Sequence, residues 1–61
     1  MDKIVAPSQL NFGDEVIINH QHFTVKDIHG PDRIGTYDLY LKDEQGRDRI
    51  EIVTEAVTLH L

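Results

Sequence analysis

The stretch NFGDEVIINHQHFTVKDI, residues 11–28, decides the fold of this chain because two apolar runs meet at a polar junction. In the first run Val16 and Ile18 fall on one side of an extended chain, and in the second run Phe23 and Val25 do the same. Successive side chains of a β-strand point to opposite faces, so this spacing is typical of a half-buried strand. The stretch therefore predicts two antiparallel strands.

The junction between the two runs, Asn19-His20-Gln21-His22, must reverse the chain without a glycine. Asn and His are among the non-glycine residues that best tolerate left-handed backbone angles, so we expect a turn here. Further along, Ile28 stays on the apolar face only if one residue bulges near Lys26-Asp27, because a strict two-residue step would select Asp27. The stretch thus predicts a hairpin whose second strand carries a bulge.

The same alternation recurs in three further runs, at residues 36–42, 47–53 and 57–61. β-branched and aromatic residues concentrate in these runs, and no window has the spacing of an amphipathic helix, so the sequence predicts an all-β protein. The inward positions give a candidate core, which comprises Val5, Leu10, Phe12, Val16, Ile18, Phe23, Val25, Ile28, Leu39, Leu41, Ile50, Ile52, Val57 and Leu59.

Short turns are expected between the runs. Pro7-Ser8-Gln9-Leu10 suits one 3₁₀ turn, because proline is tolerated early in a helix, and Thr54-Glu55-Ala56 suits a second. Asp43-Glu44-Gln45-Gly46 predicts a hairpin, since Asp favours the first position of a type I turn and Gly adopts positive φ. Five strands and one long loop at residues 29–36 predict a small barrel, one domain over residues 1–61, because a sandwich needs about a hundred residues.

A resemblance to a known architecture rests on two motifs. The order Leu10-x-Phe12-Gly13-Asp14-x-Val16, hairpin, long loop and Leu39-x-Leu41-x-Asp43-x-x-Gly46 resembles the SH3-like small barrels. Gly13-Asp14-x-Val16 is also similar to the start of KOW-type modules. The resemblance covers residues 10–61 and implies a five-stranded SH3-like barrel with one or two short 3₁₀ turns. It implies no function, because the KOW pattern has a glycine in the turn where this chain has NHQH.

The charge, the absence of cysteine and the short apolar runs disfavour or exclude several classes of function. Six Lys and Arg oppose eleven Asp and Glu, which gives a net charge of −5. A phosphate backbone repels such a surface unless the cations cluster, so nucleic-acid binding is disfavoured. The absence of cysteine excludes a disulfide and a thiolate metal site. No apolar run approaches the length of a membrane span or a signal peptide, so we expect a cytoplasmic protein that binds no membrane.

The histidines are the candidate metal ligands, and His20-Gln21-His22 is the sharpest pair. Two imidazoles at this spacing on a strand share a face, and His29 or His60 would complete a zinc set. Because His20 and His22 are expected in or beside a reversing turn, that shared face is lost, and we predict no metal site and no cofactor. Carboxylate pairs such as Asp14-Glu15 lie in turns or on wet faces, so we also predict no catalytic residue and no enzyme.

Aromatic and cationic residues supply the best candidates for partner binding. Tyr40 faces away from Leu39 and Leu41 and is expected close to Arg49 across the hairpin. Tyr and Arg are enriched at interface hot spots, and the same pair can stack single-stranded bases. The alternative is a solvated face in which the arginines form cross-strand ion pairs. The candidate contact residues, together with the loop Gly30–Thr36, are Arg33, Tyr37, Tyr40, Arg47 and Arg49.

We therefore expect a non-enzymatic protein-interaction or adaptor module, of the kind that a mobile element encodes as a small accessory protein. Its partner is another protein or, in a homodimer, a second copy. The alternation places the apolar side chains of Ile17, Tyr40 and Val53 on the outer face, where a contiguous patch would mark an interface. The alternative is a nucleic-acid-binding small barrel that uses the Tyr40/Arg47/Arg49 face. A third hypothesis is an acidic inhibitor that imitates nucleic acid.

Overall fold

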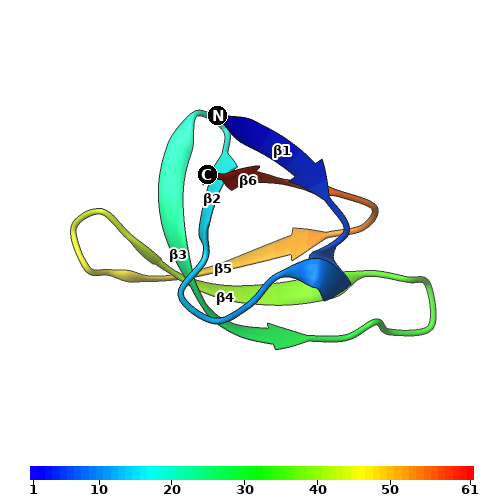
Figure 1. Cartoon of the computed structure of the whole chain (residues 1–61). Coiled ribbons are helices and arrows are strands. Elements are labelled where there is room, and N and C mark those ends of the chain that lie inside the picture. The colour runs from blue at the N-terminus through cyan, green and yellow to red at the C-terminus, as the bar shows by residue number, and fades with distance from the viewer.

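A computed structural model describes residues 1–61 and folds the chain into six antiparallel strands and one 3₁₀ turn (Figure 1). The strands form a single sheet in the order β1-β6-β2-β3-β4-β5. The predicted all-β class is confirmed, and no helix is long and apolar enough to cross a membrane. The elements are β1 (Asp2–Val5), η1 (Pro7–Gln9), β2 (Glu15–Ile18), β3 (Gln21–His29), β4 (Tyr37–Asp43), β5 (Asp48–Val53) and β6 (Val57–His60).

The sheet is open, so the expected five-stranded closed barrel is wrong. Strands β1 and β5 are its two edges and do not pair with each other. The strand β1 was not expected, because its sequence DKIV lacks alternating apolar residues; it forms by pairing with β6, from Asp2 opposite His60 to Val5 opposite Val57. Figure 1 shows β3 curving from the half of the sheet that holds β1, β2 and β6 to the half that holds β4 and β5.

A bulge bends strand β3. The pairing with β4 passes from Val25 opposite Leu41 to Asp27 opposite Tyr40, so Lys26 is the extra residue. A bulge bends its strand and increases the local twist, which helps the sheet to curl over its own inner face. The predicted bulge is confirmed, and it keeps Ile28 on the inner side of the sheet.

The hairpin between β2 and β3 turns on two residues, Asn19 and His20, whose φ angles are 51° and 65°. Two successive positive φ angles are the type I′ pattern, whose twist matches that of the flanking strands. The chain reverses without a glycine, as expected, but the turn is shorter than expected, because His22 already belongs to β3. Of the two 3₁₀ turns considered, only Pro7–Gln9 forms.

One cluster of eight buried apolar side chains forms the core between the curled halves of the sheet: Val5, Leu10, Val16, Phe23, Val25, Leu39, Leu41 and Val57. Ile18, Ile28, Val53 and Leu59 are partly buried and pack against it. Phe12, expected in the core, is 72% exposed. It lies at the tip of a turn that Asn11 and Asp14 close with two hydrogen bonds, and this turn directs its side chain outward.

The β4–β5 hairpin has a loop of three residues, Glu44-Gln45-Gly46. The N–H of Asp43 donates to the carbonyl of Arg47 at 3.0 Å, and the N–H of Gly46 donates to the carbonyl of Asp43 at 3.0 Å. Gly46 has a φ of 78°. This is a type I turn followed by a glycine bulge, and its third loop residue sets the register of β5.

Because of that extra residue, Tyr40 lies opposite Ile50, and Leu41 lies opposite Arg49. A two-residue loop would have placed Tyr40 opposite Arg49. A slip of one residue moves every side chain of a strand to the other face. The expected burial of Ile50 and Ile52 is therefore wrong: they are 61% and 69% exposed, while Val53 packs against the core.

Candidate functional site

The candidate contact residues do not form one face. Tyr40 lies beside Ile50 on the outer side of the sheet, whereas Arg49 lies beside Leu41 on the inner side, so the expected Tyr40–Arg49 neighbourhood is wrong. Arg47 binds within its own hairpin, where its Nε donates to Asp43 Oδ2 at 3.2 Å and its Nη2 donates to the side chain of Gln45. The stacking platform required for the nucleic-acid alternative is therefore not assembled.

The two remaining candidates flank the loop of residues 30–36. Arg33 is exposed and takes part in none of the six ion pairs of the chain. Tyr37 is half-buried and lies opposite Val53, on the side of the sheet that faces the core. Of these two residues, Arg33 is the more exposed.

Asp32 organises this loop. Its Oδ1 accepts hydrogen bonds from the N–H groups of Ile34 and Thr36, both at 3.0 Å, and its Oδ2 accepts the hydroxyl of Thr36. The hydrogen bonds from Thr36, with that from Ile34, lower the pKa of the Asp32 carboxyl below its usual range, because they favour the charged form. Two backbone hydrogen bonds add to these: the N–H of Asp32 donates to the carbonyl of Thr36 at 3.0 Å, and the N–H of Gly35 donates to the carbonyl of Asp32 at 3.1 Å. Asp32 thus holds the loop through its carboxylate and its backbone.

The outer surface of β4 and β5 carries an apolar patch that the sequence did not predict. It consists of Tyr40, Ile50 and Ile52, and the ring of His29 leans on Tyr40 with 4.8 Å between the ring centroids. Strand β5 is also an edge of the sheet. Exposed apolar side chains beside an unpaired backbone edge are typical of an interaction surface.

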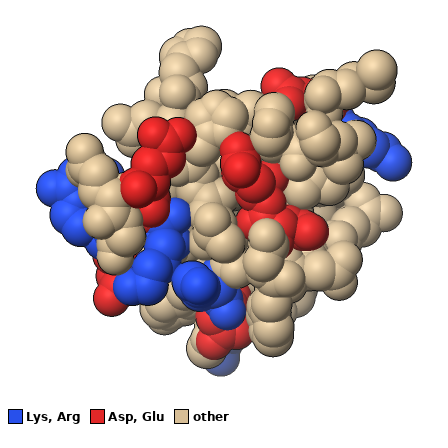
Figure 2. Space-filling view, turned by 60° about the vertical axis from the view of Figure 1, so that its left-hand side comes forward, with Lys and Arg blue, Asp and Glu red and all other residues tan.

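Charged residues do not form an unbroken acidic surface near this hairpin. Figure 2 brings the β4–β5 hairpin side forward and shows Lys and Arg gathered there, with Asp and Glu among and beside them. Lys42, for example, pairs with Asp48 at 2.8 Å, and Arg47 pairs with Asp43 at 3.2 Å. An acidic imitation of nucleic acid would need carboxylates in a line, and this face does not provide them.

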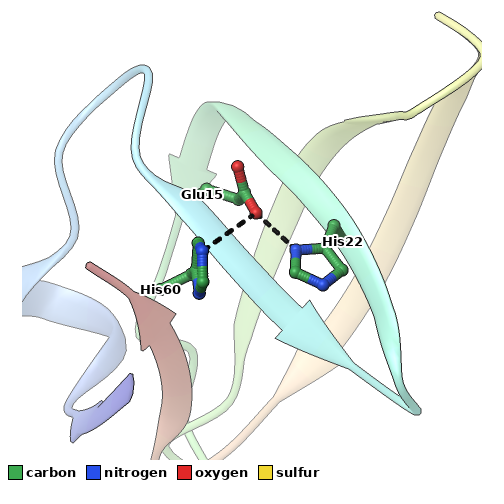
Figure 3. A group of neighbouring side chains, drawn as sticks. All are labelled: Glu15, His22 and His60. Carbon is green, nitrogen blue, oxygen red and sulfur yellow. Dashed lines mark hydrogen bonds and ion pairs between the residues drawn. The ribbon is translucent and has the colours of Figure 1, made fainter. Parts of the chain in front are cut away.

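A second feature is a group of three polar side chains on the outer side of β2, β3 and β6: Glu15, His22 and His60 (Figure 3). Glu15 lies opposite His60 across β2 and β6, and His22 lies one diagonal away on β3. Glu15 Oε2 is hydrogen-bonded to His22 Nδ1 and lies 3.9 Å from His60 Nε2. The two imidazole rings meet edge to face, with centroids 5.2 Å apart.

Two carboxylates act on the histidines of this group: Glu15 on the pKa of His22, and Asp2 on the orientation of His60. The hydrogen bond with Glu15 raises the pKa of the His22 imidazole, because the carboxylate favours the charged ring. His60 Nδ1 donates to Asp2 Oδ1 at 2.8 Å, so that Asp2, on β1, orients the His60 ring. The side chains are partly exposed and can therefore exchange their partners with solvent species.

Sequence reasoning missed this group, although each of the three residues occupies a strand position whose side chain is expected to point to solvent. Glu15 alternates with Val16, His22 with Phe23 and His60 with Leu59. The missing information was the order of the strands, which sets β2 between β3 and β6. The other two histidines stay outside the group: His20 lies in the turn, and His29 is bound to Asp27 at 2.8 Å.

Known proteins give no further guide to these two features. The chain matches no protein-family model, no curated protein and no solved structure. The SH3-like and KOW-type resemblances therefore have no support from a family, and the structure shows a small all-β antiparallel protein.

Proposed function

We propose that this chain is a non-enzymatic protein-interaction module that binds through the edge strand β5. The observation that carries this proposal is the exposure of Ile50 and Ile52 on a strand that has one unpaired edge. An edge strand presents free N–H and C=O groups, which a second strand can bind by extending the sheet. Apolar side chains beside the edge add a surface that loses water on binding.

The hairpin determines which backbone groups are free. Asp43 and Arg47 close it with a hydrogen bond, and hydrogen-bonded and non-hydrogen-bonded pairs alternate along the strands from there. Every second residue of β5 therefore directs its N–H and C=O away from β4. These residues are Asp48, Ile50 and Ile52.

The partner that fits this edge is β5 of a second copy. In an antiparallel pair with its two-fold axis at Ile50, Arg49 of each copy faces Glu51 of the other. Neither residue has an ion-pair partner in its own chain. Axes at Arg49 or Glu51 would instead place like charges opposite each other, which is destabilising. Among axes at Arg49, Ile50 and Glu51, the charges of β5 thus favour the axis at Ile50.

The same register continues the apolar patch across the axis. Tyr40 lies beside Ile50 within one chain, and the two Ile50 side chains would meet at the axis. The result is a row of four apolar side chains on one side of a joined sheet. A two-fold contact of this kind is closed, so it gives a dimer rather than a fibre.

The architecture also supports a relation to SH3-like modules. The meander β2-β3-β4-β5 is followed by a final strand that returns beside β2. We propose that the chain is an open relative of those small barrels, with β1 added at the edge beside β6. Such folds serve many functions, so the binding role rests on β5 and not on this relation.

The test is sedimentation velocity of the full chain over a concentration series. We expect a monomer–dimer equilibrium for the wild type. Arg49→Glu or Glu51→Arg alone should weaken the dimer about tenfold, because each places two like-charge contacts across the axis. The double variant Arg49→Glu/Glu51→Arg exchanges the charges and should restore dimerisation. Arg33→Glu, a charge reversal in the distant loop, is the matched control and should leave the dimer unchanged.

Two results would contradict the proposal at different levels. A wild type that stays monomeric throughout the series, or a double variant as weak as the single ones, overturns the second copy in this register. Chemical cross-linking to other protein chains, compared between the wild type and the variant Ile50→Lys, then tests whether the β5 edge binds any partner. If no contact to any chain depends on Ile50, the proposal that β5 is a binding edge fails as well.

A further inference from the structure

We infer that Glu15, His22 and His60 bind a divalent transition-metal ion, with zinc the first candidate. One ligand atom from each residue lies within 4.8 Å of the others, and the three come from neighbouring strands (Figure 3). Two imidazole nitrogens and one carboxylate oxygen form a donor set that zinc accepts, and the fourth coordination position remains open to solvent. This site is separate from the β5 edge and does not depend on it.

The two rings have the separation expected of two ligands of one ion. Their centroids are 5.2 Å apart, and their planes are inclined at 80°. With zinc–nitrogen bonds of about 2.0 Å and a tetrahedral angle, two ligating imidazoles have centroids about 5 Å apart. Rotations of the side chains on the three neighbouring strands would bring the donors to the ion.

Asp2 supplies the support that a metal-binding histidine needs. It accepts the Nδ1–H of His60 at 2.8 Å, and the His60 Nε2 is left facing Glu15 at 3.9 Å. A metal-binding histidine usually donates its other ring N–H to a carboxylate, which fixes the tautomer and the direction of the free nitrogen. Asp2 is held opposite His60 by the pairing of β1 with β6.

The charge of the site also favours a cation. Glu15 and Asp2 bring two carboxylates, and neither pairs with a Lys or an Arg. A divalent ion would therefore meet negative charge that no fixed cation of the protein neutralises. It would replace the hydrogen bond that now joins Glu15 to His22.

The test is titration of the full chain with zinc chloride, followed by calorimetry and by the imidazole NMR signals. We expect one zinc per chain, with the signals of His22 and His60 moving together and those of His20 and His29 unchanged. His22→Ala and His60→Ala should each abolish binding, while His20→Ala and His29→Ala are the matched controls. Asp2→Asn should weaken binding about 10- to 100-fold, because it removes only the support of His60.

The NMR readout uses the wild type and does not depend on the folding of any variant. Zinc that moves all four histidine signals alike, or that moves none, would overturn the site. So would binding that persists in both His22→Ala and His60→Ala when circular dichroism shows that these variants keep the wild-type fold. A ligand role for Glu15 is refuted if Glu15→Gln binds zinc as tightly as the wild type.

Discussion

Leu41 lies opposite Arg49 across the β4–β5 hairpin, and this pairing decides which side chains of β5 the protein exposes. Arg49 takes the inner side of the sheet near its edge, so Ile50 and Ile52 take the outer side. The cause is one residue in the loop, Gly46, whose positive φ completes a bulge. A turn at the end of a strand thus creates the surface on which the proposed function depends.

Changing that turn should change the surface. In the variant Glu44→Asn/Gln45→Gly/Gly46→Lys, Asn-Gly favours a two-residue type I′ loop. We expect β5 to slip by one residue, so that Tyr40 lies opposite Arg49 and Ile50 turns inward. Cross-strand NOEs report the register directly. Persistence of the Tyr40–Ile50 contacts would show that the core, and not the turn, sets the register.

The core and the outer patch should respond differently to truncation. Leu39 is fully buried, so Leu39→Ala should cost about 2–5 kcal/mol of unfolding free energy through lost burial and the cavity left behind. Ile52 is exposed, and Ile52→Ala should change the stability of the monomer by less than about 0.5 kcal/mol. Urea unfolding at low protein concentration measures both. Comparable losses would mean that Ile52 is buried in the monomer.

The loop of residues 30–36 should loosen in acid. The pKa of Asp32 is lowered in the folded chain, so its contribution to stability is fully present above the unfolded pKa, near 4. It is lost as the pH falls through the folded pKa. Asp32→Asn should destabilise the loop at neutral pH and remove this part of the acid dependence. Amide exchange at Ile34 and Thr36 follows it, and an unchanged acid profile in the variant would contradict the assignment.

Local rules explain what could be predicted from the sequence. Alternating apolar residues predicted β2 to β6, and the step from Val25 to Ile28 required the bulge that the structure has at Lys26. Asn19 and His20 reverse the chain because these two residue types tolerate left-handed angles. Each of these features depends on a few neighbouring residues, and those residues are adjacent in the sequence.

The remaining features needed the tertiary structure. The residues Asp43-Glu44-Gln45-Gly46 are compatible with a loop of two or three residues, and only the structure shows that the three-residue loop forms and sets the register of β5. Strand β1 exists because β6 offers it an edge, and the open sheet follows from the order of all six strands.

The amino-acid sequence alone determined the alternation, the positions of the two hairpins and the bulge of this protein, because backbone preferences and the alternation of side chains act over a few residues. The fold alone decided that Ile50 and Ile52 face outward and that Glu15, His22 and His60 meet. The register of β5 follows from a loop whose length its residues leave open, and the strand order arises from contacts between distant segments. Those contacts form only when the strands assemble around the shared core.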